Sequence, residues 1–155
     1  MANVETDSAL TDTASRLRMA IARTARRLRQ EAGVELGPTT VAALATVERH
    51  GPLTPSELAD HERVKRPTAT RILRSLADAG LVERTPDPED GRSALISVTA
   101  EGRERLRRLR KRKNAYLARR MRDLDPAEIA ALQRAAEILE GMLESERGGG
   151  GEGRV

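Results

Sequence analysis

Residues 54–80, TPSELADHERVKRPTATRILRSLADAG, combine the signals for two short helices joined by a tight connection. Thr54 suits an N-cap, Pro55 suits the first helical position, and Glu57 stands three residues after the cap, as in a capping box. A second helical pattern follows within a few residues and ends at Gly80, a residue type favoured just past a helix C-terminus. This order of a short helix, a tight connection and a second helix predicts a helix-turn-helix.

The second of these helices is predicted to have two chemically different faces. Placed at about 100° per residue, its apolar side chains share one side and its basic side chains share nearly the opposite side. The apolar set is Ala69, Ile72, Leu73 and Leu76, and the opposite set is Arg66, Pro67, Thr70, Arg71 and Arg74. Arginine can bind guanine through two hydrogen bonds and threonine can contact a thymine methyl group or a phosphate, so this face suits the major groove of DNA. A merely solvated helix also explains the periodicity, but not readily the five Lys/Arg and no acid in residues 63–74.

A β-hairpin is predicted after the helix-turn-helix, because LVERT (81–85) and SALISV (93–98) are short and rich in β-branched and aliphatic residues. The connection PDPEDGR (86–92) holds two prolines, which limit flexibility and deny backbone donors to a further strand. Asp90 stands two residues before Arg92, close enough to hold the Arg92 side chain extended toward a minor groove. An ordinary charged turn explains this tip taken alone, but its position after a basic helix-turn-helix favours a DNA-binding wing.

Long amphipathic helices are predicted on both sides of this segment, and each carries only a narrow apolar seam. The seams include Leu10, Leu17 and Ile21 in the first helix and Leu132, Leu139 and Leu143 in the last. The sequence has no Phe and no Trp, so a single chain would leave much of this apolar surface uncovered. Two chains could bury the seams together as a homodimer, whereas packing within one chain is the alternative that periodicity leaves open.

The fold class that follows is mainly α with a small β-hairpin, in which a winged helix-turn-helix DNA-binding lobe is joined to N- and C-terminal dimerisation helices. A chain of 155 residues suits one domain, here residues 8–146. The predicted parts are a disordered N-terminus (1–7), dimerisation helices (8–36 and 100–146), a DNA-binding lobe (37–99) with its wing (86–92), and a disordered Gly-rich tail (147–155).

The charge distribution favours a polyanionic partner, above all double-stranded DNA or other nucleic acid. The net charge is only +4, but residues 103–122 hold eleven Lys/Arg and a single acid. A solvated helix face explains this cluster equally well. The chain has no cysteine, no apolar run of the ~20 residues that a membrane span needs, and a polar N-terminus, so we expect a soluble cytoplasmic protein without membrane contact.

Catalytic and metal-binding motifs are not found in the sequence. It contains no P-loop, no Gly-x-Gly-x-x-Gly after a strand and no Gly-x-Ser-x-Gly, so we predict neither an enzyme nor a cofactor. His50 and His61 are the only histidines, and further ligands at suitable spacing cannot be assembled around them.

The order of elements and the stretches RPTATRILRSLADAGLVER (66–84) and DPEDGR with VT (87–99) resemble the MarR family of winged-helix transcription regulators. The resemblance covers about residues 8–145 and is most specific over residues 52–102. It implies a homodimer with intertwined terminal helices, recognition helices in successive major grooves of a pseudo-palindromic operator, and wings in the flanking minor grooves. The DNA contacts that it implies are Arg66, Pro67, Thr68, Thr70, Arg71, Arg74 and Arg92, with Asp90 supporting Arg92.

Lys65 departs from the family pattern, because family members often have Ser or another capping residue just before the recognition helix. Either Lys65 contributes a phosphate contact or the helix begins a residue or so away.

The resemblance also implies a repressor released by a small phenolic or anionic effector, with pocket walls expected around Met19, Arg23, Tyr116 and the second helix. The alternative is a winged helix that binds proteins and does not bind DNA specifically. An extended Arg92 beside a basic helix argues against this alternative, because a protein-binding wing does not need it.

Overall fold

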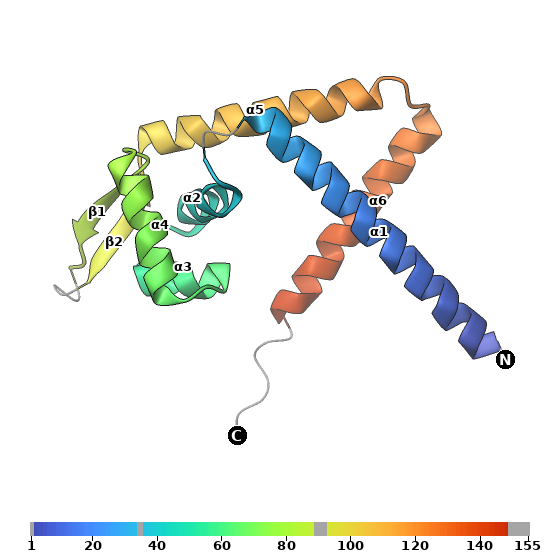
Figure 1. The fold of residues 1–155 in the computed structure, drawn as a ribbon, viewed down its shortest axis with the longest axis horizontal. Coiled ribbons are helices and arrows are strands. Elements are labelled where there is room, and N and C mark those ends of the chain that lie inside the picture. The colour runs from blue at the N-terminus through green and yellow to red at the C-terminus, as the bar shows by residue number, and fades with distance from the viewer. Residues whose placement is uncertain (1, 34–35, 89–92, 149–155) are drawn as a thin grey trace. The chain divides into compact units, whose positions relative to one another are not determined.

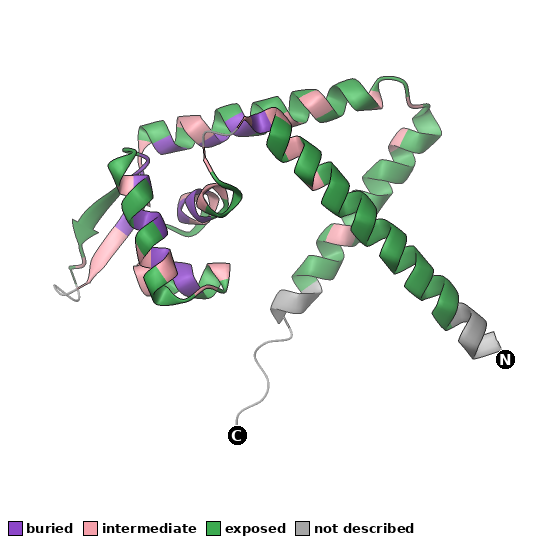
Figure 2. Cartoon of the chain, in the orientation of Figure 1, coloured by how far each residue is buried: buried purple, intermediate pink, exposed green. Residues whose placement is uncertain are grey.

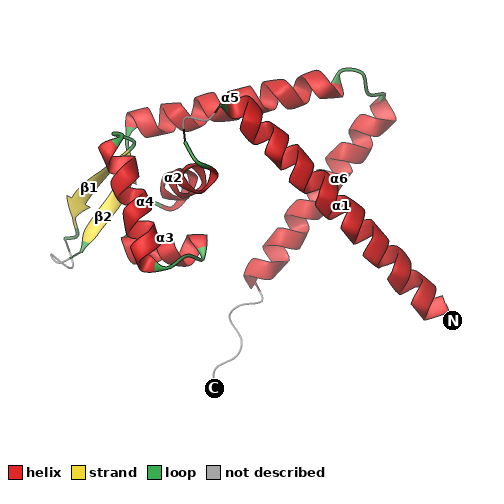
Figure 3. Ribbon diagram, viewed as in Figure 1, coloured by secondary structure: helices red, strands yellow, loops and turns green. Residues whose placement is uncertain are grey.

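A computed structural model of the chain describes residues 2–33, 36–88 and 93–148. Helices and one two-stranded antiparallel sheet follow one another along these residues (Figure 1, Figure 3). The elements are α1 (Ala2–Ala32), α2 (Pro38–His50), α3 (Pro55–Glu62), α4 (Arg66–Asp78), β1 (Val82–Pro86), β2 (Ala94–Val98), α5 (Ala100–Met121) and α6 (Pro126–Gly148). This order confirms the predicted fold class, a mainly helical chain with one hairpin after a helix-turn-helix.

The chain divides into two compact units, Met1–Tyr116 and Leu117–Val155. The first unit holds α1 to α4, the hairpin and most of α5, whereas the second holds the end of α5 and all of α6. Within the second unit, Asp125 and Glu128 form the predicted capping box at the start of α6, since each accepts a hydrogen bond from the backbone N–H of the other.

The core of the first unit gathers side chains from α2, α3, α4, the hairpin and the first half of α5 (Figure 2). Its largest fully buried side chains are aliphatic: Leu44, Val47, Leu58, Leu76, Leu81, Ile96 and Leu106. Full burial of one such side chain contributes roughly 1.5–3 kcal/mol, so these residues dominate the stability of the unit. Aliphatic side chains from α2, α3, α4, the hairpin and α5 form this core, in a sequence that has no Phe and no Trp.

Helix α1 begins at Ala2, although the seam predicts a start near Ser8 and disorder before it. Residues 2–7 contain neither Gly nor Pro, the two residue types that most disfavour a helix. The hydroxyls of Thr11 and Thr13 donate to the carbonyls of Asp7 and Ala9, one turn back. Apolar periodicity does not indicate such a polar first turn. Helix α6 likewise continues to Gly148, beyond the predicted boundary at 146.

The hairpin strands pair in one register, from Val82 opposite Val98 to Pro86 opposite Ala94. Leu53 adds an isolated bridge to Ile96, so the chain before α3 lies against the hairpin. Strand β1 begins and ends one residue later than predicted, because Leu81 belongs to the turn after α4, whereas β2 begins one residue later and ends at Val98 as predicted. Residues 89–92, which include Asp90 and Arg92 of the predicted wing (86–92), lie outside the described residues.

Gly102 allows the first turn of α5 to approach the hairpin closely. A Cβ atom at this position would overlap the Leu81 carbonyl oxygen and would lie 2.8 Å from Val98 Cγ2. Gly102 is buried, and both neighbours belong to the core region, so neither can move aside cheaply. The close contact therefore requires glycine.

We predict that Gly102→Ala lowers the free energy of unfolding by about 1–3 kcal/mol, the usual cost of forcing extra atoms into a packed site. Denaturant unfolding followed by circular dichroism measures the change. Gly141→Ala is the matched control, because a Cβ at Gly141 in α6 would meet nothing within 4 Å. It should be neutral or stabilising by up to about 1 kcal/mol through helix propensity. Equal stabilities of wild type and Gly102→Ala would contradict the close-approach argument.

Candidate nucleic-acid interface

The capping box predicted at the start of α3 is present. Thr54 Oγ1 accepts a hydrogen bond from the Glu57 backbone N–H at 3.2 Å, and Glu57 Oε2 accepts one from the Thr54 backbone N–H at 2.7 Å. The backbone and hydroxyl hydrogen bonds from Thr54 hold the pKa of Glu57 below its ordinary value. Glu57 is therefore ionised at neutral pH, and the first helix of the helix-turn-helix has a defined start.

Arg63 makes the turn between α3 and α4 in the left-handed conformation, with φ 52° and ψ 43°. A residue other than glycine pays about 1–2 kcal/mol for this conformation, so neighbouring contacts must hold it. The Val64 N–H donates to the Ala59 carbonyl at 2.9 Å, and the Val64 side chain packs against the core. These contacts set the direction in which α4 leaves the turn.

Lys65 is the N-cap residue of α4, with extended backbone and no hydrogen bond from its side chain to the helix. Its carbonyl accepts from the N–H groups of Thr68 and Ala69, which opens the helix directly after it. The helix thus begins where the sequence places it, and a displaced start is not the explanation for a lysine at this position. The exposed Lys65 ammonium remains available to a phosphate, and that contact remains a prediction.

The two predicted faces of α4 are separated in the structure. Ala69, Ile72, Leu73 and Leu76 are buried in the core. On the other side, a shallow hollow of about 510 Å³ is lined by Arg66, Pro67, Thr70, Arg71 and Arg74. Thr68, also predicted as a DNA contact, is half-buried and does not line this hollow. Five of the predicted side chains are therefore brought together on one surface.

The guanidinium groups of this surface are not neutralised within the described part of the chain. None of Arg66, Arg71 and Arg74 forms an ion pair with a carboxylate there. Arg66 is the first residue of α4, where the helix dipole adds partial positive charge, and Arg71 and Arg74 follow along the same face. The surface therefore attracts anions, and phosphates or base acceptors suit it.

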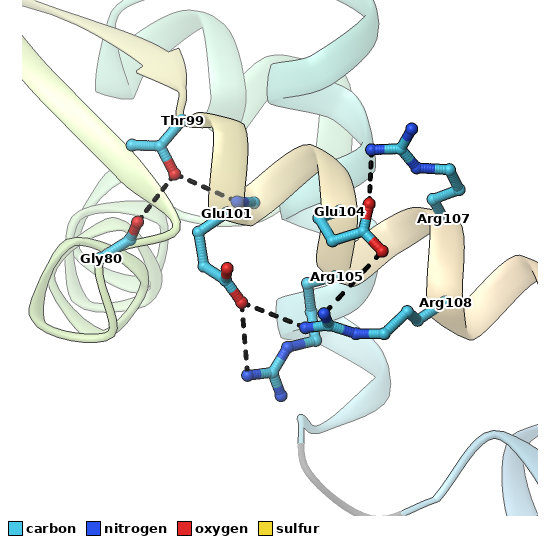
Figure 4. A network of polar contacts seen from close by, with 8 residues as sticks. Gly80, Thr99, Glu101, Glu104, Arg105, Arg107 and Arg108 are labelled. Carbon is cyan, nitrogen blue, oxygen red and sulfur yellow. Dashed lines mark hydrogen bonds and ion pairs between the residues drawn. The ribbon is translucent and has the colours of Figure 1, made fainter.

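The basic residues of α5 differ, because much of their charge is used inside the chain (Figure 4). Glu101 pairs with Arg105 and Arg108, and Glu104 pairs with Arg107 and Arg108. At the start of α5, Arg103 donates to the Val98 carbonyl. Further along α5, Arg110 pairs with Glu48 of α2, and Arg112 donates to the Ala32 carbonyl of α1. The sequence explains this cluster equally well by a solvated helix face and by a polyanion-binding one, and these contacts within the chain favour the solvated face.

Comparison with known proteins identifies the class to which these elements belong. The model of the MarR family matches residues 36–94. A helix-turn-helix transcriptional regulator of Mycobacterium tuberculosis is 36% identical over 132 residues, covering 84% of this chain and 92% of the relative. The chain belongs to the MarR family. This MarR-family protein is a transcriptional regulator, as the sequence predicts, and its relatives are not enzymes.

Solved structures resemble this MarR-family chain over most of its length. A putative transcriptional regulator from Pseudomonas aeruginosa superimposes with a TM-score of 0.77 at 33% identity, covering 85% of this chain and 94% of the other. FabT of Streptococcus pneumoniae, solved in complex with DNA, has a TM-score of 0.67 at 18% identity, covering 85% of this chain and 98% of FabT. The likeness to FabT shows the fold alone.

An apolar pocket of about 630 Å³ lies in the first unit of this MarR-family regulator, between the end of α1, the start of α2, and α5. Leu28, Leu36, Val41 and Leu109 are among its apolar walls, and Arg26, Arg29 and Lys113 also line it. Met19, Arg23 and Tyr116, expected as walls from the sequence, do not line this pocket. The Tyr116 ring instead lies 5.7 Å from the Arg27 guanidinium carbon, in a cation–π contact between α5 and α1.

His50 and His61 stack on one another, with ring centroids 4.3 Å apart and planes inclined by 17°. Their separation of eleven residues in the sequence carries no signal for this contact, which arises from the packing of α2 on α3. Across residues 2–33, 36–88 and 93–148, no three His, Asp or Glu side chains gather as a metal site. In the same part of the chain, no helix has the length and apolarity to cross a membrane.

Proposed function

We propose that this regulator recognises a pseudo-palindromic DNA operator as a homodimer and represses transcription by binding it. The observation that carries the proposal is the outer face of α4, where Arg66, Arg71 and Arg74 gather with Thr70 and have no acidic partner among the described residues. An α-helix fits the major groove, which is about 12 Å wide, and guanidinium groups match the acceptors of guanine there. FabT, which has the same fold, was solved in complex with DNA, and this supports DNA binding by the present chain.

The proposed roles differ along the helix. Thr70, Arg71 and Arg74 would contact base edges, and Pro67 would pack against the groove wall. Lys65, Arg66 and Thr68, at the start of α4, would bind phosphates and thereby set the register. Arg92 would enter the minor groove with Asp90 holding it, an interpretation that rests on sequence alone. Such a regulator would act in the cytoplasm, where the DNA is.

Exposed apolar seams support a homodimer. On α1, Leu10 is 66% exposed and Ile21 is 47% exposed. On α6, Leu132 is 47% exposed and Leu143 is 60% exposed, whereas Leu139 is half-buried. Large aliphatic side chains repeated along a helix mark an interaction surface, and a two-fold partner would bury both helices at once. The same symmetry would place two α4 helices about one turn of DNA apart, as a pseudo-palindrome requires.

The pocket between α1, α2 and α5 supports release of DNA by a small effector. Its walls are largely apolar, and Arg26, Arg29 and Lys113 add positive charge, so a small anion with an apolar body would be accommodated. Such an effector would release DNA only if it bound the DNA-incompetent arrangement more tightly.

Specific binding is tested by enriching a duplex from a random-sequence pool and titrating it, with a scrambled duplex beside it, at several salt concentrations. We expect a clear preference for the enriched duplex and a steep fall in affinity with salt. Arg71→Ala should weaken binding to the enriched duplex about five- to 150-fold, corresponding to about 1–3 kcal/mol for one base contact. The matched control is Arg134→Ala, because Arg134 of α6 pairs with Glu137 in its own helix. This substitution should leave the affinity for the enriched duplex unchanged.

If no sequence is enriched, or if both duplexes bind equally and Arg71→Ala changes nothing, the proposal of an operator-binding repressor is wrong. A winged helix that binds proteins would then be the better interpretation of the basic face.

The proposed dimer predicts a sedimenting mass of twice the 17.0 kDa chain. Ile21→Glu, which places a charge within the α1 seam, should shift the equilibrium toward monomer because an unpaired charge cannot be buried there cheaply. Arg23→Glu serves as the control, since this exposed residue lies on another side of α1. A wild-type protein that sediments as a monomer at micromolar concentration would refute the dimer.

The effector proposal predicts that 1-naphthoate lowers affinity for the enriched duplex, whereas the uncharged 1-naphthamide has a much weaker effect. The comparison isolates the anion that Arg26, Arg29 and Lys113 would attract. Ala42→Trp, which fills the pocket from α2, should make DNA binding insensitive to the carboxylate. Fluorescence anisotropy of the labelled duplex measures both effects. An equal response of wild type and Ala42→Trp would place any effector elsewhere.

A further inference from the structure

Thr99 joins the end of the recognition helix α4 to the start of α5. Its hydroxyl donates a hydrogen bond to the Gly80 carbonyl at 2.7 Å and accepts one from the Gly102 N–H at 3.0 Å (Figure 4). The Thr99 backbone N–H donates to the Leu81 carbonyl at 3.1 Å. One residue therefore caps α5 and at the same time binds Gly80 and Leu81 in the turn that follows α4.

Gly80 and Leu81 are fixed to the last turn of α4. Gly80 has φ +70°, its N–H donates to the Ala77 carbonyl at 2.9 Å, and the Leu81 N–H donates to the Leu76 carbonyl at 2.9 Å. This pair of hydrogen bonds is the Schellman arrangement. Leu76 and Leu81 are both buried to 1% exposure, so the turn is also held by packing. A displacement of the Gly80 carbonyl therefore displaces the end of α4.

The first turns of α5 are held equally firmly. Gly102 packs against the Leu81 carbonyl at a distance that admits no side chain. The Arg103 guanidinium donates to the Val98 carbonyl at 3.1 Å, and the Glu101 and Glu104 ion pairs run along the exposed side of the helix. Each of these exposed pairs contributes little to stability, but they lie along a helix already fixed by its cap.

Further along, the same helix contacts α1, α2 and the apolar pocket. Arg110 pairs with Glu48 of α2, and the Arg112 guanidinium donates to the Ala32 carbonyl at the end of α1 at 3.1 Å. Leu109 and Lys113 line the pocket. Helix α5 thus connects the pocket, through Thr99, to the end of α4.

We infer that Thr99 is a positioning residue for DNA recognition: its hydroxyl sets the angle between α4 and α5, through which a shift of α5 reaches the recognition helix. The inference rests on the proposed DNA binding. Arg71 is nine residues from Gly80, about 13 Å along the helix. A rotation of about 10° at Gly80 would move Arg71 by about 2 Å, enough to break a hydrogen bond to a base.

Two substitutions separate this role from simple helix capping. Thr99→Val keeps the shape of the side chain but removes the hydroxyl. Thr99→Asp keeps an oxygen that can cap α5, but when ionised it has no hydrogen to donate to the Gly80 carbonyl. Thr99→Ser retains both functions.

The quantity to measure is the ratio of affinities for the enriched and scrambled duplexes, together with denaturant unfolding of each variant. Thr99→Val and Thr99→Asp should lower the ratio about threefold to thirtyfold, the range for side chains that couple two sites, and Thr99→Ser should restore it. Asp125→Ala is the control, because its capping bonds to Glu128 stay within α6. It should lose stability without changing the ratio.

A wild-type ratio in Thr99→Asp would overturn the inference and leave Thr99 as a cap alone, and this variant decides the question if Thr99→Val does not fold. A wild type that itself shows no preference between the duplexes would contradict the proposed function instead.

Discussion

Burial of one side of α4 is the interaction on which the rest of the structure depends. Ala69, Ile72, Leu73 and Leu76 are held in a core built by α2, α3, the hairpin and α5. Because side chains three and four residues apart share a helix face, fixing these four residues also fixes the opposite side. The basic residues of α4 are exposed as a consequence of the core, and no separate interaction is needed to present them.

Charge pairing separates the two basic regions of the chain. Helix α5 has the higher density of arginine, yet Glu48, Glu101 and Glu104 pair with several of these residues, and others cap helix ends or strand ends. Helix α4 has fewer basic residues, and its three arginines have no acid partner within the described residues. Affinity for a polyanion depends on the charge that remains unpaired, so the less basic helix is the better candidate for the interface.

Backbone geometry at both ends of α4 holds the helix in place. Before it, Arg63 turns the chain in a left-handed conformation that Val64 secures through the core. After it, Gly80 turns the chain again and Thr99 ties that turn to α5. A helix anchored at both ends can change its angle only when a neighbouring element moves.

The sequence by itself determined the parts of this protein that depend on neighbouring residues. The capping boxes at Thr54 and Asp125, the two faces of α4 and the glycine stop at Gly80 follow from spacings of one to four residues, and all are present. The resemblance to the MarR family likewise depended on contiguous motifs.

Only the tertiary structure decided which side chains far apart in the chain meet. It paired Arg110 with Glu48, stacked His50 on His61, and placed Thr99 against Gly80. It also decided which residues line the pocket, and Met19, Arg23 and Tyr116 are not among them. The physical reason is range: local hydrogen bonds and periodic burial are encoded within one or two turns, whereas long-range contacts depend on how whole helices pack.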